Sequence, residues 1–205
     1  MNKSLKEIVF SKNVIEFVTV SKEFCDFLEK SSDFEIKTFI NKTLKILSLL
    51  YLKTLLLPET EQIHEEGNEK FVSEFDWQFI KNGIQSLLNE KDYYLDFFDT
   101  EMNETPEPVT SSISENLADI YQDLKDFLGI YQIGIDELSN DAIFECIESF
   151  NKYWGFKLVN SLRILHNLEF VKMEEVQNPL IKDKVSRDVS NWFISKAQND
   201  FQSNE

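Results

Sequence analysis

Glycine, proline and cysteine are scarce in this sequence of 205 residues, which contains 5 glycines, 4 prolines and 2 cysteines. Barrels and sandwiches need many turn residues between their short strands, so this scarcity argues against an all-β fold. Phenylalanine, by contrast, occurs 18 times, and hydrophobic residues make up 42% of the chain. A chain of this size and composition can bury a core of its own, and we expect a single all-α domain over residues 1–205.

Positive charge is also scarce, because 21 lysines and arginines stand against 37 aspartates and glutamates, which gives a net charge of -16. Proteins that bind nucleic acids or anionic membranes normally gather lysine and arginine against the phosphates. The acidic residues are spread over most of the chain, and such a charge distribution repels polyanions. We therefore expect neither nucleic acid nor a membrane as a partner.

The sequence shows no sign of export or of redox chemistry. Cys25 and Cys146 occupy apolar positions of expected helices, without CxxC or metal-ligand spacing, and we interpret them as small buried hydrophobic residues. Residues 1–10 contain no apolar run that could act as a signal peptide. The most apolar stretch, residues 44–57, is shorter than the roughly 20 residues that cross a bilayer. We expect a cytoplasmic protein.

Apolar residues recur at three- and four-residue spacing in six segments, which predicts a helix in each. The expected helices cover about residues 11–29, 32–57, 74–89, 112–134, 141–168 and 181–197. A further turn or two is expected over residues 92–99, a flexible acidic surface loop near 59–70, and a linker near 100–111, where Pro106 and Pro108 lie.

These helices are expected to form an antiparallel bundle of six or seven helices, built from two helical hairpins packed together. Two S-x-x-E capping boxes, at Ser32 and Ser112, predict the start of a helix in each hairpin. The C-terminal halves of the second and fifth helices are apolar around most of their perimeter, so both should lie at the centre of the core. Four leucines should therefore be almost fully buried: Leu50, Leu55, Leu162 and Leu165.

A polar stripe on the helix over residues 141–168 is the first candidate site. Asn160, Arg163 and His166 lie on this stripe, and Arg163 is one of two arginines in the chain. Its forked guanidinium suits a carboxylate or a phosphate. The functional hypothesis is a pocket for a small anionic ligand, floored by Trp154 and closed by another helix. The alternative is a structural salt bridge, with His166 near the negative end of the helix dipole.

Carboxylates provide the second candidate site. Asp92, Asp96 and Asp99 would share one face if their segment were helical, and three carboxylates can hold Mg²⁺ for phosphate chemistry. The helix over residues 112–134 offers a second set, namely Glu115, Asp119, Asp123 and Asp126. The alternative is that these residues form solvated faces of an acidic protein.

Other catalytic motifs are weak or absent in the sequence. Glu61 and His64 match E-x-x-H, but a di-iron bundle needs two copies on helices and further inward-facing glutamates, and these two lie in a predicted loop. We find no glycine-rich phosphate loop and no GxSxG elbow. We expect no metal and no other cofactor.

Two segments resemble a known family. Residues 49–59 (LLYLKTLLLPE) and 153–166 (YWGFKLVNSLRILH) are similar to an uncharacterised, all-helical bacterial family described as a domain of unknown function. The resemblance implies an all-α fold and a bacterial cytoplasmic setting, and it supplies no catalytic residue.

The favoured interpretation is a non-catalytic bacterial module that binds a ligand or a protein, because no set of residues combines a nucleophile or metal site with a base. Its partner would be a small anion, an unidentified protein, or a second copy that pairs through Trp192 and Phe193. The alternative is a Mg²⁺-dependent phosphohydrolase that uses the carboxylates of residues 92–99 and 112–134.

Overall fold

The computed structural model describes residues 4–65, 67–97 and 108–171 of the chain. These residues belong to one compact unit that spans residues 1–172, and a second unit, residues 173–205, lies outside the described residues. The expected helix over 181–197, with Trp192 and Phe193, falls in that second unit. The same is true of the expected dimer contact through these two aromatic residues.

The described residues form seven α-helices and one β-hairpin. In chain order they are α1 (Leu5–Val9), α2 (Lys12–Leu28), α3 (Ile36–Leu55), α4 (Glu74–Leu88), β1 (Tyr93–Phe97), β2 (Pro108–Ser112), α5 (Ile113–Ile133), α6 (Asp136–Ser149) and α7 (Gly155–Phe170). Short 3₁₀ turns cover Ser31–Asp33 and Asn89–Asp92, and a π-helical turn covers Phe150–Trp154.

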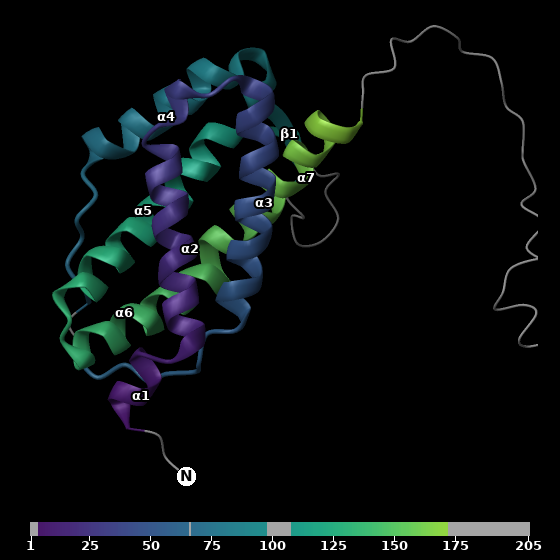
Figure 1. Cartoon of the computed structure of the whole chain (residues 1–205). Coiled ribbons are helices and arrows are strands. Elements are labelled where there is room, and N and C mark those ends of the chain that lie inside the picture. Colours follow the sequence, from purple (N-terminus) through teal and green to yellow (C-terminus); the bar gives the residue numbers. More distant parts are fainter. Residues whose placement is uncertain (1–3, 66, 98–107, 172–205) are drawn as a thin grey trace, which may run out of the picture. The chain divides into compact units, whose positions relative to one another are not determined.

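Two helical hairpins make up the bundle, as predicted. In Figure 1, α2 and α3 lie side by side as the first hairpin, and α5 with α6 and α7 forms the second. Contacts between α2 and α5 and between α3 and α7 hold the two hairpins together, while α4 packs on α5. The all-α fold class is confirmed, with the small β-hairpin as an addition.

The sequence signals at the helix ends have mixed outcomes. The side chain of Ser112 accepts a hydrogen bond from the backbone N–H of Glu115 and so caps α5, and Gly134 ends this helix with a left-handed φ of 77°. The capping box at Ser32 was wrong. Ser32 lies inside a 3₁₀ turn, and α3 begins at Ile36 without a side-chain cap.

The predicted helix over residues 141–168 begins earlier, at Asp136, and is divided by the π-helical turn into α6 and α7. Gly155 follows this turn, and its N–H bonds to the carbonyl oxygen of Phe150. A Cβ at position 155 would lie 2.5 Å from that oxygen, so the turn depends on a glycine here. The extra residue of a π turn shifts the side chains of α7 relative to those of α6.

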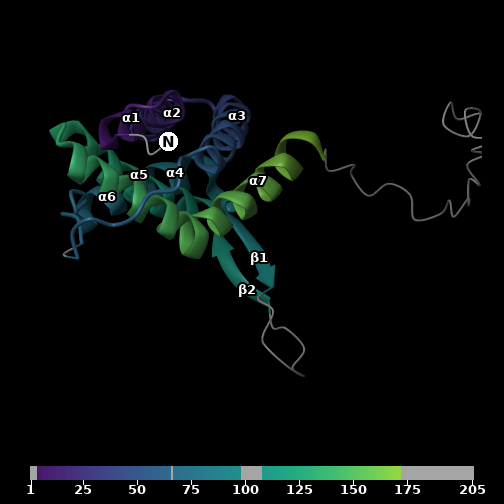
Figure 2. The same cartoon turned by 90° about the horizontal axis from the view of Figure 1, so that it is seen from below.

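The segment predicted as a helical turn over residues 92–99 was wrong. Tyr93–Phe97 is a strand that pairs antiparallel with Pro108–Ser112, with Leu95 opposite Thr110. The predicted linker near 100–111 therefore contains most of the second strand, and its residues 100–107 lie outside the described part of the chain. Figure 2 shows the hairpin projecting from the helices beside α7.

The burial of the four predicted core leucines is uneven. Leu50 and Leu165 are fully buried, Leu162 is half-buried, and Leu55 is 59% exposed, so the prediction for Leu55 was wrong. The C-terminal half of α3 is apolar all round, yet one side of it faces outward, including Leu49 and Leu52. Its centre-facing side meets the largest buried side chains, among them Trp154, Phe17, Phe24 and Phe39.

Several smaller expectations can be compared with the structure. Cys25 and Cys146 are buried and unpaired, as predicted. None of the described helices is both long and apolar enough to cross a membrane. The acidic segment between α3 and α4 is irregular, and carboxylates of the second hairpin hold it: Asp141 accepts the N–H groups of Ile63 and His64, and Asp126 those of Phe71 and Val72.

Candidate functional site

A pocket of about 640 Å³ lies where the β-hairpin leaves the bundle. The hairpin supplies one wall, the first turns of α5 a second, and the π-helical turn with the start of α7 a third. The lining residues are Tyr94, Asp96, Thr110, Ser111, Ser112, Glu115, Asn116, Asp119, Lys152, Tyr153, Phe156, Lys157 and Asn160. We refer to it as the hairpin pocket.

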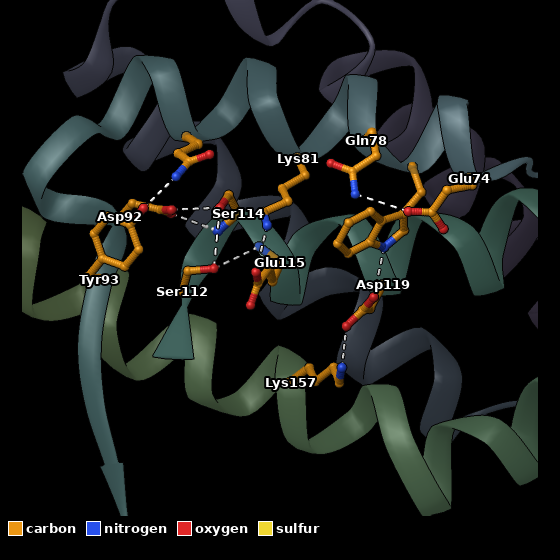
Figure 3. Close-up of polar contacts among 12 residues, drawn as sticks. Glu74, Gln78, Lys81, Asp92, Tyr93, Ser112, Ser114, Glu115, Asp119 and Lys157 are labelled. Atoms are coloured by element: carbon orange, nitrogen blue, oxygen red, sulfur yellow. Dashed lines mark hydrogen bonds and ion pairs between the residues drawn. The ribbon is translucent and has the colours of Figure 1, made fainter. Parts of the chain in front are cut away.

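A buried carboxylate fixes the start of the hairpin to α5. Asp92 is fully buried and accepts hydrogen bonds from the backbone N–H of Ser114 at 2.8 Å and from its hydroxyl at 2.6 Å (Figure 3). Burial raises the pKa of Asp92, and the two bonds from Ser114 oppose this shift. Asp92 is therefore a structural anchor that places β1 beside the N-terminus of α5.

Two further carboxylates of α5 connect neighbouring helices to the pocket wall (Figure 3). Glu115 pairs with Lys81 of α4 at 2.7 Å, which raises the pKa of that lysine. Asp119 accepts the indole N–H of Trp77 from α4 at 2.8 Å and pairs with Lys157 of α7 through its other oxygen. Each of these acids thus has a cation beside it.

Two hydrogen bonds join the hairpin to the helices. Nδ2 of Asn160 donates to Asp96 at 2.9 Å, and Nδ2 of Asn116 donates to the phenolic oxygen of Tyr94 at 2.6 Å. Burial raises the pKa of Tyr94, so its hydroxyl stays protonated at neutral pH. The inner side of the hairpin is thereby held against α5 and α7.

Arg163 lies at the rim of this site. Its guanidinium is 3.7 Å from Asp96, and its side chain is 52% exposed. Among the described residues, Asp96 is the one acid paired with it. The exposed part of a guanidinium with five N–H donors remains accessible to a ligand.

Aromatic side chains form the outer edge of the pocket. Tyr153, in the π-helical turn, is 65% exposed, and Phe156, one residue into α7 after Gly155, is 69% exposed. π-helical turns occur often at functional sites, because the extra residue redirects side chains. Here the turn directs Lys152 and Tyr153 toward the same pocket.

The hydrogen-bonding capacity of the pocket favours acceptor groups on a ligand. The carboxylates of Asp96, Glu115 and Asp119 each already face a cation. Asn116 and Asn160 each use one amide N–H in the bonds described above, and an amide group has two. Lys152 and Lys157 each have one carboxylate partner for three N–H donors.

The structure separates the four residues of the predicted anion site. Asn160 lines the hairpin pocket and Arg163 lies at its rim. Trp154 is fully buried and packs edge-on against Phe150 in the core. His166 faces a different groove, between α3 and α7, where it contacts Phe170. The wall opposite Asn160 is a strand, whereas another helix was expected.

The carboxylates of the predicted Mg²⁺ site also have separate partners. Asp92 is bound by Ser114, Asp96 lies on a strand, and Asp99 is outside the described residues. The acids of α5 contact Lys81, Lys157, Ser149 and the loop before α4, in the order Glu115, Asp119, Asp123 and Asp126. Over residues 4–65, 67–97 and 108–171, no three His, Cys, Asp or Glu side chains are placed to hold a metal.

The E-x-x-H segment has a structural arrangement. Nδ1 of His64 lies 2.7 Å from Asp141, which also accepts two backbone N–H groups of the same loop. The carbonyl oxygen of Glu61 accepts a hydrogen bond from Asn140. These contacts fasten the loop to α6.

Sequence analysis missed Tyr94, Asn116 and Lys157 as pocket residues. Tyr94 depends on a strand whose alternation is obscured by apolar residues on both faces, YYLDF. The sequence PVTSS, which follows a proline-rich stretch and contains β-branched residues, was the available strand signal. Asn116 and Lys157 lie on helices and carry no motif of their own.

A second, larger groove of about 790 Å³ lies between α2, α4 and α5. Its lining is mostly apolar and includes Phe71, Phe79 and Leu128, with Lys22 and Lys125 among its polar residues. Lys125 is paired with Glu29 at 2.6 Å and Lys22 with Asp26. This groove contains fewer unused N–H donors beside aromatic rings than the hairpin pocket.

The comparisons with known proteins agree with the geometry of the helices. The sequence pattern of the family described as "Domain of unknown function (DUF5063)" matches residues 8–171. The chain belongs to this family. The DUF5063 match contains all seven α-helices except the first residues of α1, and it contains the whole hairpin pocket. The resemblance inferred from residues 49–59 and 153–166 is thus confirmed.

A crystal structure of protein BF1032 from Bacteroides fragilis is similar to this DUF5063 chain. The two share 43% sequence identity, the alignment covers 82% of this chain and 99% of the other, and the TM-score is 0.74. None of the curated proteins compared with the chain matches it. The function of the domain must therefore be argued from its own surface.

Proposed function

We propose that this protein is a non-catalytic binding module whose hairpin pocket takes a small ring compound that carries a carboxylate or a similar oxygen acceptor. The observation that carries the proposal is the composition of the pocket. Its carboxylates are already paired, its remaining polar capacity consists of N–H donors on Asn116, Asn160, Lys152 and Lys157, and aromatic rings form its edge.

Each part of such a ligand has a place in the pocket. A flat ring would lie against the exposed faces of Tyr153 and Phe156. Its carboxylate would accept hydrogen bonds from Lys157 and Asn160, with Arg163 at the rim. The net charge of -16 disfavours anions at long range, so the cations at the pocket supply the local attraction that an anionic ligand needs.

We also place the protein in the bacterial cytoplasm. The buried thiols of Cys25 and Cys146 are unpaired, which suits a reducing compartment, and a relative that is 43% identical comes from a bacterium.

The test is a thermal unfolding screen of the full chain with benzoate, indole-3-acetate and inorganic phosphate. A ligand that binds the native state raises the midpoint, and we expect this of the aromatic carboxylates but not of phosphate. Lys157→Met should abolish the shift. Lys22→Met, in the groove between α2, α4 and α5, is the matched control and should retain it. A shift that survives Lys157→Met but disappears in Lys22→Met would place the site in the other groove.

A further inference from the structure

Positive charge in this acidic protein is concentrated on two helices. α3 and α7 together carry six lysines and arginines and one acid, Glu169, whereas α5 and α6 together carry one lysine and nine acids. The two basic helices contact each other, and Nδ2 of Asn41 donates to Glu169 at 3.0 Å (Figure 1). The chain therefore has one basic face on a molecule of net charge -16.

The same face carries exposed apolar side chains. Leu49, Leu52 and Leu56 follow one another on the outward side of α3, and Leu52 is 51% exposed. Phe170 at the end of α7 is also exposed. A helix that is apolar all round normally needs cover on every side, and the described residues leave this side of α3 open.

A groove of about 550 Å³ lies along this open side. Leu49 and Leu52 line it from α3, His166 and Phe170 line it from α7, and Lys45 lies one turn before Leu49. The part of α3 that borders the groove runs from Asn41 to Leu52, which is about 16 Å at 1.5 Å per residue. Three turns of a docked helix would span that length.

We infer that this groove, between α3 and α7, docks an acidic amphipathic helical segment of a partner protein. Apolar residues of such a segment at positions i, i+3 or i+4 and i+7 would cover Leu49, Leu52 and Phe170. Its glutamates and aspartates would face Lys45 and His166 on the groove and the other cations of this face. The inference does not rest on the hairpin pocket.

Charge and shape together favour this occupant over others. An anionic membrane also offers negative charge and apolar depth, but the site is a groove between two helices, and the rest of the chain repels an anionic surface. A second copy would bring a further net charge of -16. A short acidic segment brings its negative charge to the basic face alone.

The test is a fluorescence anisotropy titration of the full chain against a labelled 18-residue peptide of leucine, alanine and glutamate, with its leucines at helical i, i+3, i+4 and i+7 spacing. We expect saturable binding that Leu52→Asp weakens at least about tenfold, because it places a carboxylate in the groove. Lys45→Glu should weaken binding about fivefold or more by charge reversal. Leu55→Asp is the matched control: Leu55 is exposed on the same helix but outside the groove lining, so binding should change less than about twofold.

The outcomes separate the occupants. No saturable binding of the peptide up to about 1 mM would overturn the inference, as would equal binding of a peptide in which lysine replaces every glutamate. Binding to phosphatidylserine vesicles that is lost in Leu52→Asp, without peptide binding, would assign the face to a membrane instead. A dimer in sedimentation equilibrium that Leu52→Asp dissociates would assign it to a second copy.

Discussion

Asn160 and Asp96 join the last described helix of the bundle to the β-hairpin, because Nδ2 of Asn160 donates to Oδ2 of Asp96 across 2.9 Å. The other oxygen of Asp96 lies 3.7 Å from Arg163. One carboxylate of the strand thus contacts two side chains that lie three residues apart on α7. This contact closes the hairpin pocket on the side of α7 and holds Arg163 at the rim with half of its side chain exposed.

Replacing Arg163 with methionine should lower the free energy of unfolding by about 1 kcal/mol or less, because exposed ion pairs contribute little. Urea denaturation of the two proteins measures the difference. A loss of about 3–5 kcal/mol is the result expected of a broken buried pair, and it would show that Arg163 is part of the scaffold.

Replacing Asp141 with asparagine should destabilise the protein at pH 7 and have little effect in acid. Burial alone would raise the pKa of Asp141, but hydrogen bonds from Ile63 and His64 outweigh it, and the net result is a lowered pKa. A lowered carboxyl pKa stabilises the fold above the ordinary value, near 3.9, and this contribution is lost as the pH falls through the folded value.

The expected loss for Asp141→Asn is about 1–3 kcal/mol at pH 7, as for hydrogen bonds to a charged group. Denaturation of wild type and variant between pH 7 and about pH 3 measures it, and the two stabilities should converge below about pH 4. Glu137→Gln, an exposed acid in the first turn of the same helix, is the control. A difference that is constant over the whole range would show that the charge of Asp141 contributes nothing.

Adding a methyl group at Gly155 should disturb the π-helical turn. The new Cβ would lie 2.5 Å from the carbonyl oxygen of Phe150, so the backbone must move, and we expect a loss of about 1–3 kcal/mol. Gly67→Ala is the control, because its Cβ would meet a single side-chain oxygen at 3.4 Å, and its effect should stay within about 0.5 kcal/mol. Equal stabilities of the two variants in thermal and urea unfolding would contradict this account of the turn.

Two leucines that the sequence predicts to be equally buried should differ in their effect on stability. Leu165→Ala removes a fully buried side chain from the core and should cost about 2–5 kcal/mol. Leu55→Ala removes a side chain that is 59% exposed and should cost less than about 1 kcal/mol. Similar losses for both would mean that the C-terminal end of α3 is covered in solution.

The helices could be predicted from the sequence because their apolar residues recur with helical spacing over many turns. The positions of α2, α3, α4 and α5 follow from that spacing, with Gly134 and Ser112 as end signals. The π-helical turn could not be predicted in this way, because Gly155 is compatible with an ordinary helix as well. The strand over Tyr93–Phe97 was missed because its five residues, apart from Asp96, are apolar or aromatic and show no clear alternation.

The candidate site could be predicted in part. Asn160 and Arg163 were found because they form the polar side of an otherwise apolar helix. Their neighbours Tyr94 and Asp96 come from a hairpin some 60 residues away in the sequence, and periodicity within one helix cannot reveal such a partner. His166 and Trp154 shared the same segment, but a helix distributes successive residues around its axis, so these two face the α3 groove and the core.

The most direct test of the proposed binding function is a titration of the ¹⁵N-labelled chain with indole-3-acetate, observed through the side-chain amide signals of asparagine. The account predicts saturable shifts of the Asn116 and Asn160 amides, which line the hairpin pocket, and no shift of Asn82, which lies on α4 beside another groove. Shifts confined to Asn82 and Gln132, with Asn116 and Asn160 unchanged, would contradict the account and place the ligand along α4 and α5.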